Sequence, residues 1–131
     1  MTQHASGSFD ITTTPASPPE HAGRTAIGRM QLDKQYAGDL AATGKGQMLT
    51  AVTDTQGSAA YVAIERVTGT LNGKKGSFVI QHTGTMSGGA KQAVIAVVPD
   101  SGTEELTGIR GTLTLKLVER KHFYEFDYVL P

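Results

Sequence analysis

Residues 58–86 read SAAYVAIERVTGTL, NGKK and GSFVIQHTGTM, and this stretch decides the fold. Asn-Gly between two runs of alternating apolar and polar residues is the strongest short-range signal for a β-hairpin. The sequence therefore predicts two long antiparallel strands, residues 58–71 and 76–86. A four-residue turn, residues 72–75, joins them.

The register of this hairpin follows if Leu71 and Gly76 flank the turn. The expected pairs are then Leu71–Gly76, Gly69–Phe78, Val67–Ile80, Glu65–His82, Ala63–Gly84 and Tyr61–Met86. An aromatic ring opposite a strand glycine covers bare backbone, which favours this register. Because side chains alternate along a strand, all of these residues share one mostly apolar face. Arg66 and the threonines lie on the opposite, outward face.

One acid and one imidazole, Glu65 and His82, are thus expected opposite each other on the apolar face. Glutamate is uncommon in a protein interior unless it is paired. Two interpretations remain open. The pair either satisfies two polar groups of the core or lies at the floor of a pocket as a functional pair, since structural networks and active sites share this appearance.

The rest of the chain also reads as strands separated by turn residues. The expected strands are residues 5–14, 24–37, 40–53, 91–98, 111–118 and 121–130, although residues 30–40 could also form a short helix. Residues 15–23, PASPPEHAG, are expected to be a mobile, proline-rich loop. The chain is therefore predicted to be all-β, with about eight strands and little or no helix.

Regular turns and glycines inside strands favour a small closed antiparallel barrel, formed by a single domain over residues 1–131. Eight strands leave an interior that side chains fill or that holds one small ligand. The candidate site residues are those on the expected inner face. Glu65 and His82 are the candidate catalytic residues, and Tyr61, His122, Tyr124 and Tyr128 are the candidate ligand-binding residues.

Composition excludes several classes of function. The 131 residues contain 12 basic and 12 acidic side chains, so we expect neither a nucleic-acid nor a membrane partner. Cysteine is absent, which excludes disulfides and thiolate chemistry. No signal peptide or membrane-spanning run is recognisable, which indicates a cytoplasmic protein. No spacing motif indicates a metal or a cofactor; a metal set of Glu65, His82 and His122 would require contacts across the interior.

Several long segments resemble a known family in the same order along the chain. They are MQLDKQYAGDL, GKGQML, residues 57–86, VVPDSGTEELTGIRGTLTL and KHFYEFDYVLP. Together they resemble a bacterial domain of unknown function, family 3224, whose members look like the allene oxide cyclase barrel. That resemblance implies an eight-stranded antiparallel barrel with an internal cavity. It implies no activity, because no catalytic set of the cyclases is matched here.

Three hypotheses for function follow. The first is a barrel that binds a small, largely apolar ligand in its interior. The second is a cofactor-free cyclase or isomerase, in which Glu65 and His82 move a proton while Tyr61 and Tyr124 orient the substrate. The third is a filled barrel that acts through the surface of a homo-oligomer, with Arg66 in the subunit contact or in solvent.

Overall fold

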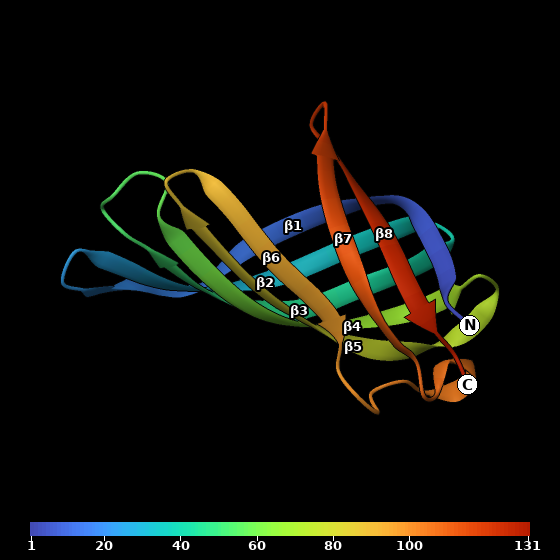
Figure 1. Ribbon diagram of the computed structural model, residues 1–131. Coiled ribbons are helices and arrows are strands. Elements are labelled where there is room, and N and C mark those ends of the chain that lie inside the picture. The colour runs from blue at the N-terminus through green and yellow to red at the C-terminus, as the bar shows by residue number, and fades with distance from the viewer.

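The computed structural model describes residues 1–131 as a closed barrel of eight antiparallel strands in the order β1 to β8 (Figure 1). The strands are β1 Gln3–Ala22, β2 Thr25–Gly38, β3 Leu40–Val52, β4 Ala59–Leu71, β5 Lys74–Ser87, β6 Ala90–Val97, β7 Arg110–Val118 and β8 Lys121–Val129. One turn of 3-10 helix, η1 Glu104–Leu106, lies between β6 and β7. The structure contains no helix with the length and hydropathy of a membrane span. The predicted all-β barrel is confirmed.

The β4–β5 hairpin forms where it was expected, but its turn is shorter than predicted. Asn72 and Gly73 alone make the turn, both with positive φ, so Leu71 pairs with Lys74. The predicted register was therefore wrong by two residues, and Glu65 faces Ile80 while His82 faces Ala63. A shift of two residues leaves every side chain on its predicted face, because side chains alternate with period two.

Strand β1 is longer than the sequence suggested. The expected loop at residues 15–23 is a continuation of the strand as far as Ala22, with irregularities in its pairing after Pro15. The prediction was wrong because β1 pairs with β8 only from Gln3 to Phe9, so the remainder of β1 has a partner on one side only. Proline is tolerated on such an edge strand, where a missing N–H costs no ladder bond.

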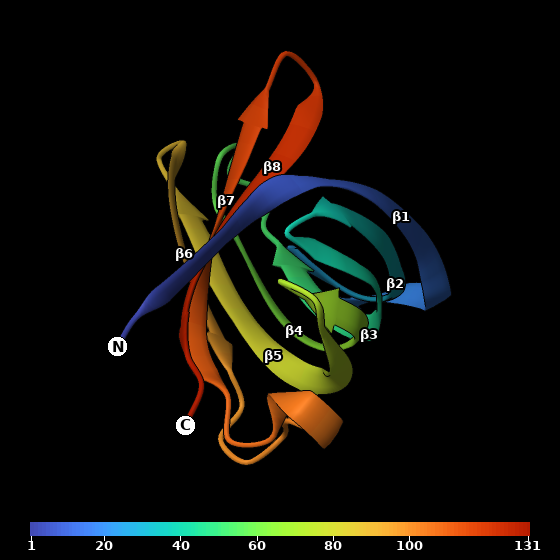
Figure 2. The ribbon, with the colours of Figure 1, turned by 90° about the vertical axis from the view of Figure 1, so that its right-hand side faces the viewer.

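One end of the barrel is closed by packed side chains. Leu106 of η1 and Ile109 are fully buried beneath the strands, together with Phe78, Phe126 and Tyr128. The rings of Phe78 and Phe126 stack with their centroids 5.6 Å apart. Figure 2 shows η1 and the segment around it lying against this end of the barrel. We refer to it as the closed end.

The other end of the barrel is not covered. Strands β6 and β7 pair only at Ile95–Leu113 and Ala96–Thr112, and beyond these pairs the two strands diverge (Figure 1). Inner-face side chains past this seam are half-buried or exposed. They are Ile11, Met30, Met48, Tyr61, Met86 and Leu117. We refer to this region as the open end.

Candidate functional site

A cluster of four polar side chains lies on the inner face, between the two ends. Its centre is the carboxylate of Glu65, which is wholly buried. Glu65 Oε1 lies 2.9 Å from Lys34 Nζ and 3.2 Å from His82 Nε2, and Glu65 Oε2 accepts a hydrogen bond of 2.5 Å from the Tyr36 hydroxyl. Lys34 and His82 are each 3% exposed. We call Lys34, Tyr36, Glu65 and His82 the Glu65 cluster.

Strand β3 makes room for this cluster with two glycines. Gly44 pairs with Lys34 of β2, and Gly46 pairs with Glu65 of β4, so β3 carries no side chain between the two charged residues. A Cβ atom on Gly44 would collide with the carboxylate of Glu65. These two glycines therefore allow a lysine and a glutamate two strands apart to meet.

The neighbours of Glu65 keep it ionised. Burial by itself would raise the pKa of Glu65, but the hydrogen bond to His82, the charge of Lys34 and the Tyr36 hydroxyl together lower that pKa below its ordinary value. For Tyr36, burial and then the negative charge of Glu65 raise the pKa of the hydroxyl far above its ordinary value. Tyr36 is thus a fixed hydrogen-bond donor.

Aromatic rings surround the ammonium group of Lys34. Its Nζ lies 5.1 Å from the centroid of the Phe9 ring and 5.8 Å from that of Tyr36, within the range of cation–π attraction. The Phe9 ring in turn stacks on His122 at 5.0 Å. The positive charge is therefore stabilised by one carboxylate and two rings, which offsets part of the cost of its burial.

The predicted site residues divide into two groups. Glu65 and His82 are in direct contact, and the Tyr61 ring lies next to His82, with ring centroids 6.5 Å apart. Tyr61 is half-buried at the open end, where it covers Gly84. Tyr61, His82 and Glu65 thus form a row of neighbouring side chains that leads from the open end to the Glu65 cluster.

Tyr124 and Tyr128 lie towards the closed end, and their hydroxyls have protein partners. Tyr124 accepts a hydrogen bond from the backbone N–H of Leu40 at 2.8 Å and donates to the carbonyl of Ala37, which ties down the turn between β2 and β3. The Tyr128 hydroxyl accepts a hydrogen bond from the Asn72 side chain at 2.7 Å. His122 is half-buried beside Phe9. Neither tyrosine hydroxyl forms a hydrogen bond with the Glu65 cluster, although the Tyr124 ring packs against Tyr36 in a T-shaped contact at 5.7 Å.

Sequence reasoning missed Lys34 and Tyr36 as site residues. The signal was present in the alternation of β2, where Leu32, Lys34 and Tyr36 fall on one face. A lysine between two apolar neighbours at period two points into the barrel and needs an acidic partner there. No group of three or more potential metal ligands comes together in the structure, and His122 does not join Glu65 and His82.

The chemistry available to the cluster follows from its hydrogen bonds. Both oxygens of Glu65 are occupied, and the lowered pKa makes this carboxylate a weak base. His82 makes one hydrogen bond, through Nε2, so its Nδ1 has no partner in the chain. No fully buried side-chain nitrogen or oxygen lacks a partner, so Nδ1 retains a small exposed area although His82 is only 3% exposed. The cluster therefore presents one free imidazole nitrogen backed by an ionised carboxylate.

These features define a small antiparallel barrel with one closed end and a buried ionised cluster beneath the open one. The model of a family described as a protein of unknown function (DUF3224) matches residues 5–128, and the chain belongs to this family. A crystal structure of a DUF3224 protein from Shewanella oneidensis MR-1 superposes with a TM-score of 0.96 at 43% identity, over 100% of this chain and 98% of that one. No match was found among curated proteins. The barrel is consistent with the resemblance to allene oxide cyclase.

Proposed function

We propose that the barrel binds a small, largely apolar ligand at its open end, with the polar end of the ligand directed towards His82. The observation that carries this proposal is the free Nδ1 of a histidine that is otherwise buried and anchored to Glu65. An imidazole held in this way is a single, oriented hydrogen-bonding group at the base of an apolar surface. Binding sites for small molecules commonly combine these two features.

The apolar part of the proposed site is formed largely by methionines. Three of the four methionines in the chain, Met30, Met48 and Met86, lie half-buried on the inner face at the open end. Met30 and Met48 are direct cross-strand partners. Methionine side chains are flexible and polarisable, and they adapt to ligands of irregular shape. The ring of Tyr61 lies between this surface and His82.

The same geometry favours binding over the cyclase or isomerase hypothesis. A general base works best when its pKa lies near the working pH and when it can reach the substrate. Glu65 meets neither condition, because its pKa is lowered and both of its oxygens are already held by Lys34, His82 and Tyr36. Glu65 is better suited to holding His82 in one orientation.

The proposal is tested with the uncharged fluorescent probe N-phenyl-1-naphthylamine and two lysine substitutions in β3. Met48 points inwards at the open end, whereas its neighbour Gln47 points outwards. We expect fluorescence to rise on binding to the wild type. Met48→Lys should weaken the affinity by about tenfold or more, because it places a charge in an apolar site at a cost of at least about 1.4 kcal/mol.

Gln47→Lys is the matched control, because it adds the same charge to the adjacent position on the other face. It should bind the probe with an affinity within about twofold of the wild type, well below the tenfold change that 1.4 kcal/mol produces. Circular dichroism of both variants checks that the barrel is intact. If the wild type does not bind the probe, or if Met48→Lys binds it as tightly as Gln47→Lys does, the open end is not the binding site.

A further inference from the structure

The outer face of the barrel carries a second feature, separate from the interior. Strands β2 to β5 form a surface hollow of about 740 Å³, to which outward side chains contribute apolar area and positive charge. Its apolar lining is Leu49, Val62, Ala63, Ile64 and Val79, its lysine and arginine residues are Arg29, Lys45 and Arg66, and His82 lies on its border. We call this the outer hollow. Its volume lies in the range of sites for small molecules.

The apolar part of the outer hollow is exposed. Leu49 and Val62 are cross-strand partners, and Ile64 follows two residues further along β4. Each of these three residues is about half exposed: 50% for Leu49, 49% for Val62 and 53% for Ile64. Two smaller hollows also include Val62, so the apolar surface continues beyond the main one. This row offers contact area for the apolar part of a ligand.

The charges of the outer hollow are not neutralised by the chain. Lys45 and Arg66 are direct cross-strand partners, and like charges placed opposite each other destabilise a sheet. The nearest acid is Asp33, 3.9 Å from Lys45, and both side chains are mostly exposed, so this ion pair is weak. Arg29 and Arg66 form no salt bridge, and no acidic residue lines the hollow. An anion between Lys45 and Arg66 would relieve their repulsion.

We propose that the outer hollow binds a small amphipathic monocarboxylate. Its carboxylate lies between Lys45 and Arg66, and its apolar chain follows Ile64, Val62 and Leu49. Arg66, Ile64 and Val62 lie two residues apart in sequence on one face of β4, so the row spans about 14 Å. Two paired cations at one end and an apolar row leading away from them, with Arg29 beside Leu49 at its far end, match an amphiphile rather than an inorganic anion.

The charge pattern also argues against a second copy of this chain as the occupant. A two-fold interface places the same patch on both partners, so Arg29, Lys45 and Arg66 would meet their own counterparts without any acid to separate them. His82 also borders the hollow, but the apolar side chains of the two proposed sites differ: Leu49, Val62 and Ile64 point outwards, whereas Met30, Met48 and Met86 point inwards. The amide shifts at these two sets of residues therefore distinguish the two proposals.

The test is a titration of the wild type with decanoate, followed by the amide resonances in ¹H–¹⁵N spectra. We expect the largest shifts at Leu49, Val62 and Ile64. The double variant Lys45→Gln/Arg66→Gln should weaken decanoate binding by about tenfold or more, since charge-assisted hydrogen bonds contribute most to such a contact. Decanol, which lacks the charge, should bind the wild type more weakly by a similar factor.

The matched control is Lys74→Gln/Lys75→Gln, which removes two neighbouring positive charges at the exposed start of β5, outside the hollow. This variant should bind decanoate as the wild type does. If both double variants weaken decanoate binding equally, the effect comes from the net charge of the protein and the proposal is overturned. Unchanged binding by Lys45→Gln/Arg66→Gln, or shifts concentrated at Met48, Tyr61 and Met86, would also overturn it. A wild-type dimer in sedimentation velocity that buries Ile64 would assign the hollow to a subunit contact instead.

Discussion

The two ends of this barrel are built from the same strands but have different surroundings. At the closed end, Leu106 and Ile109 plug the interior, and the hydroxyls of Tyr124 and Tyr128 hold the adjacent turns. At the open end, the same inner faces present Met30, Met48 and Met86 half-exposed. The difference shows that burial on the inner face depends on whether something covers the end, and not on the alternation of the strands alone.

The Glu65 cluster lies between these two environments. It has the burial of the closed end, yet one of its members, His82, contacts the ring of Tyr61 at the open end. Buried ion pairs are seldom the most stabilising solution for a core. A barrel selected for stability alone would gain from apolar side chains at these positions. The cluster therefore joins the buried closed end to the half-exposed open end.

The largest expected effect comes from breaking the cluster. Glu65→Leu should lower the free energy of unfolding by about 3–5 kcal/mol, because it leaves the ammonium of Lys34 buried without its partner. The double variant Glu65→Leu/Lys34→Met should recover much of this loss. Urea denaturation measures both. If Glu65→Leu alone is as stable as the wild type, the two charges are not held in a buried pair.

The second effect compares the two ends directly. Leu106→Ala should cost about 2–5 kcal/mol, because Leu106 is fully buried and a cavity would remain. Met86→Ala removes a side chain of similar size that is half-exposed at the open end, and it should cost less than about 1.5 kcal/mol. The same denaturation experiment compares them. Equal losses would mean that the open end is covered in solution.

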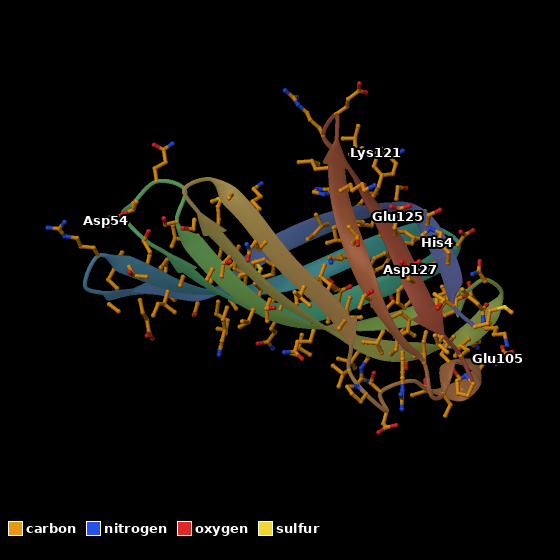
Figure 3. All side chains as sticks on the ribbon, in the orientation of Figure 1. His4, Asp54, Glu105, Lys121, Glu125 and Asp127 are labelled. Carbon is orange, nitrogen blue, oxygen red and sulfur yellow. The ribbon has the colours of Figure 1, made fainter.

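The smallest effect concerns the β1–β8 seam, where His4 of β1 contacts Asp127 and Glu125 of β8 at the surface (Figure 3). The hydrogen bond to Asp127, 2.7 Å long, and the surrounding acids raise the pKa of His4. A raised pKa in the folded state stabilises the fold at pH values below the unfolded pKa, and this gain disappears as the pH rises through the folded pKa.

Thermal melts of His4→Gln and the wild type should therefore differ more at about pH 5.5 than at about pH 8.5. His21 offers a matched control, because it is exposed near the far end of β1 and has no ion pair with an acid. His21→Gln should show no such trend. A difference in melting temperature that is the same at both pH values would mean that the contact with Asp127 does not form in solution.

Much of the fold could be predicted from the sequence, because alternation in β2, β4, β5, β7 and β8 is regular and the turns carry glycine. The parity of each strand, and hence the inward position of Glu65 and His82, needed no further information. The register of the β4–β5 hairpin did require further information, because a two-residue and a four-residue turn at Asn72 leave the same faces inward. Alternation cannot distinguish these two registers.

The remainder depended on contacts distant in the sequence. Strand β1 tolerates Pro15 because its pairing with β8 ends at Phe9, so one side of the strand has no partner there. The sequence of β1 alone does not reveal where this pairing ends. The contact of Lys34 with Glu65 depends on β3 lying between them and on Gly44 being small. The partial covering of the interior depends on where β6 and β7 separate, and neither strand carries a residue pattern that marks this point.

The order of the strands in the wall is also their order in the chain, and this has a consequence for how the barrel forms. Every pairing except β1–β8 joins consecutive strands, so most of the wall can assemble from local hairpins with short loops to close. Only the contact of β1 with β8 brings together segments as distant as His4 and Asp127, 123 positions apart. Non-local contacts slow folding. The pairing of β1 with β8 is therefore expected to be the slow step of folding, whereas the hairpins form faster.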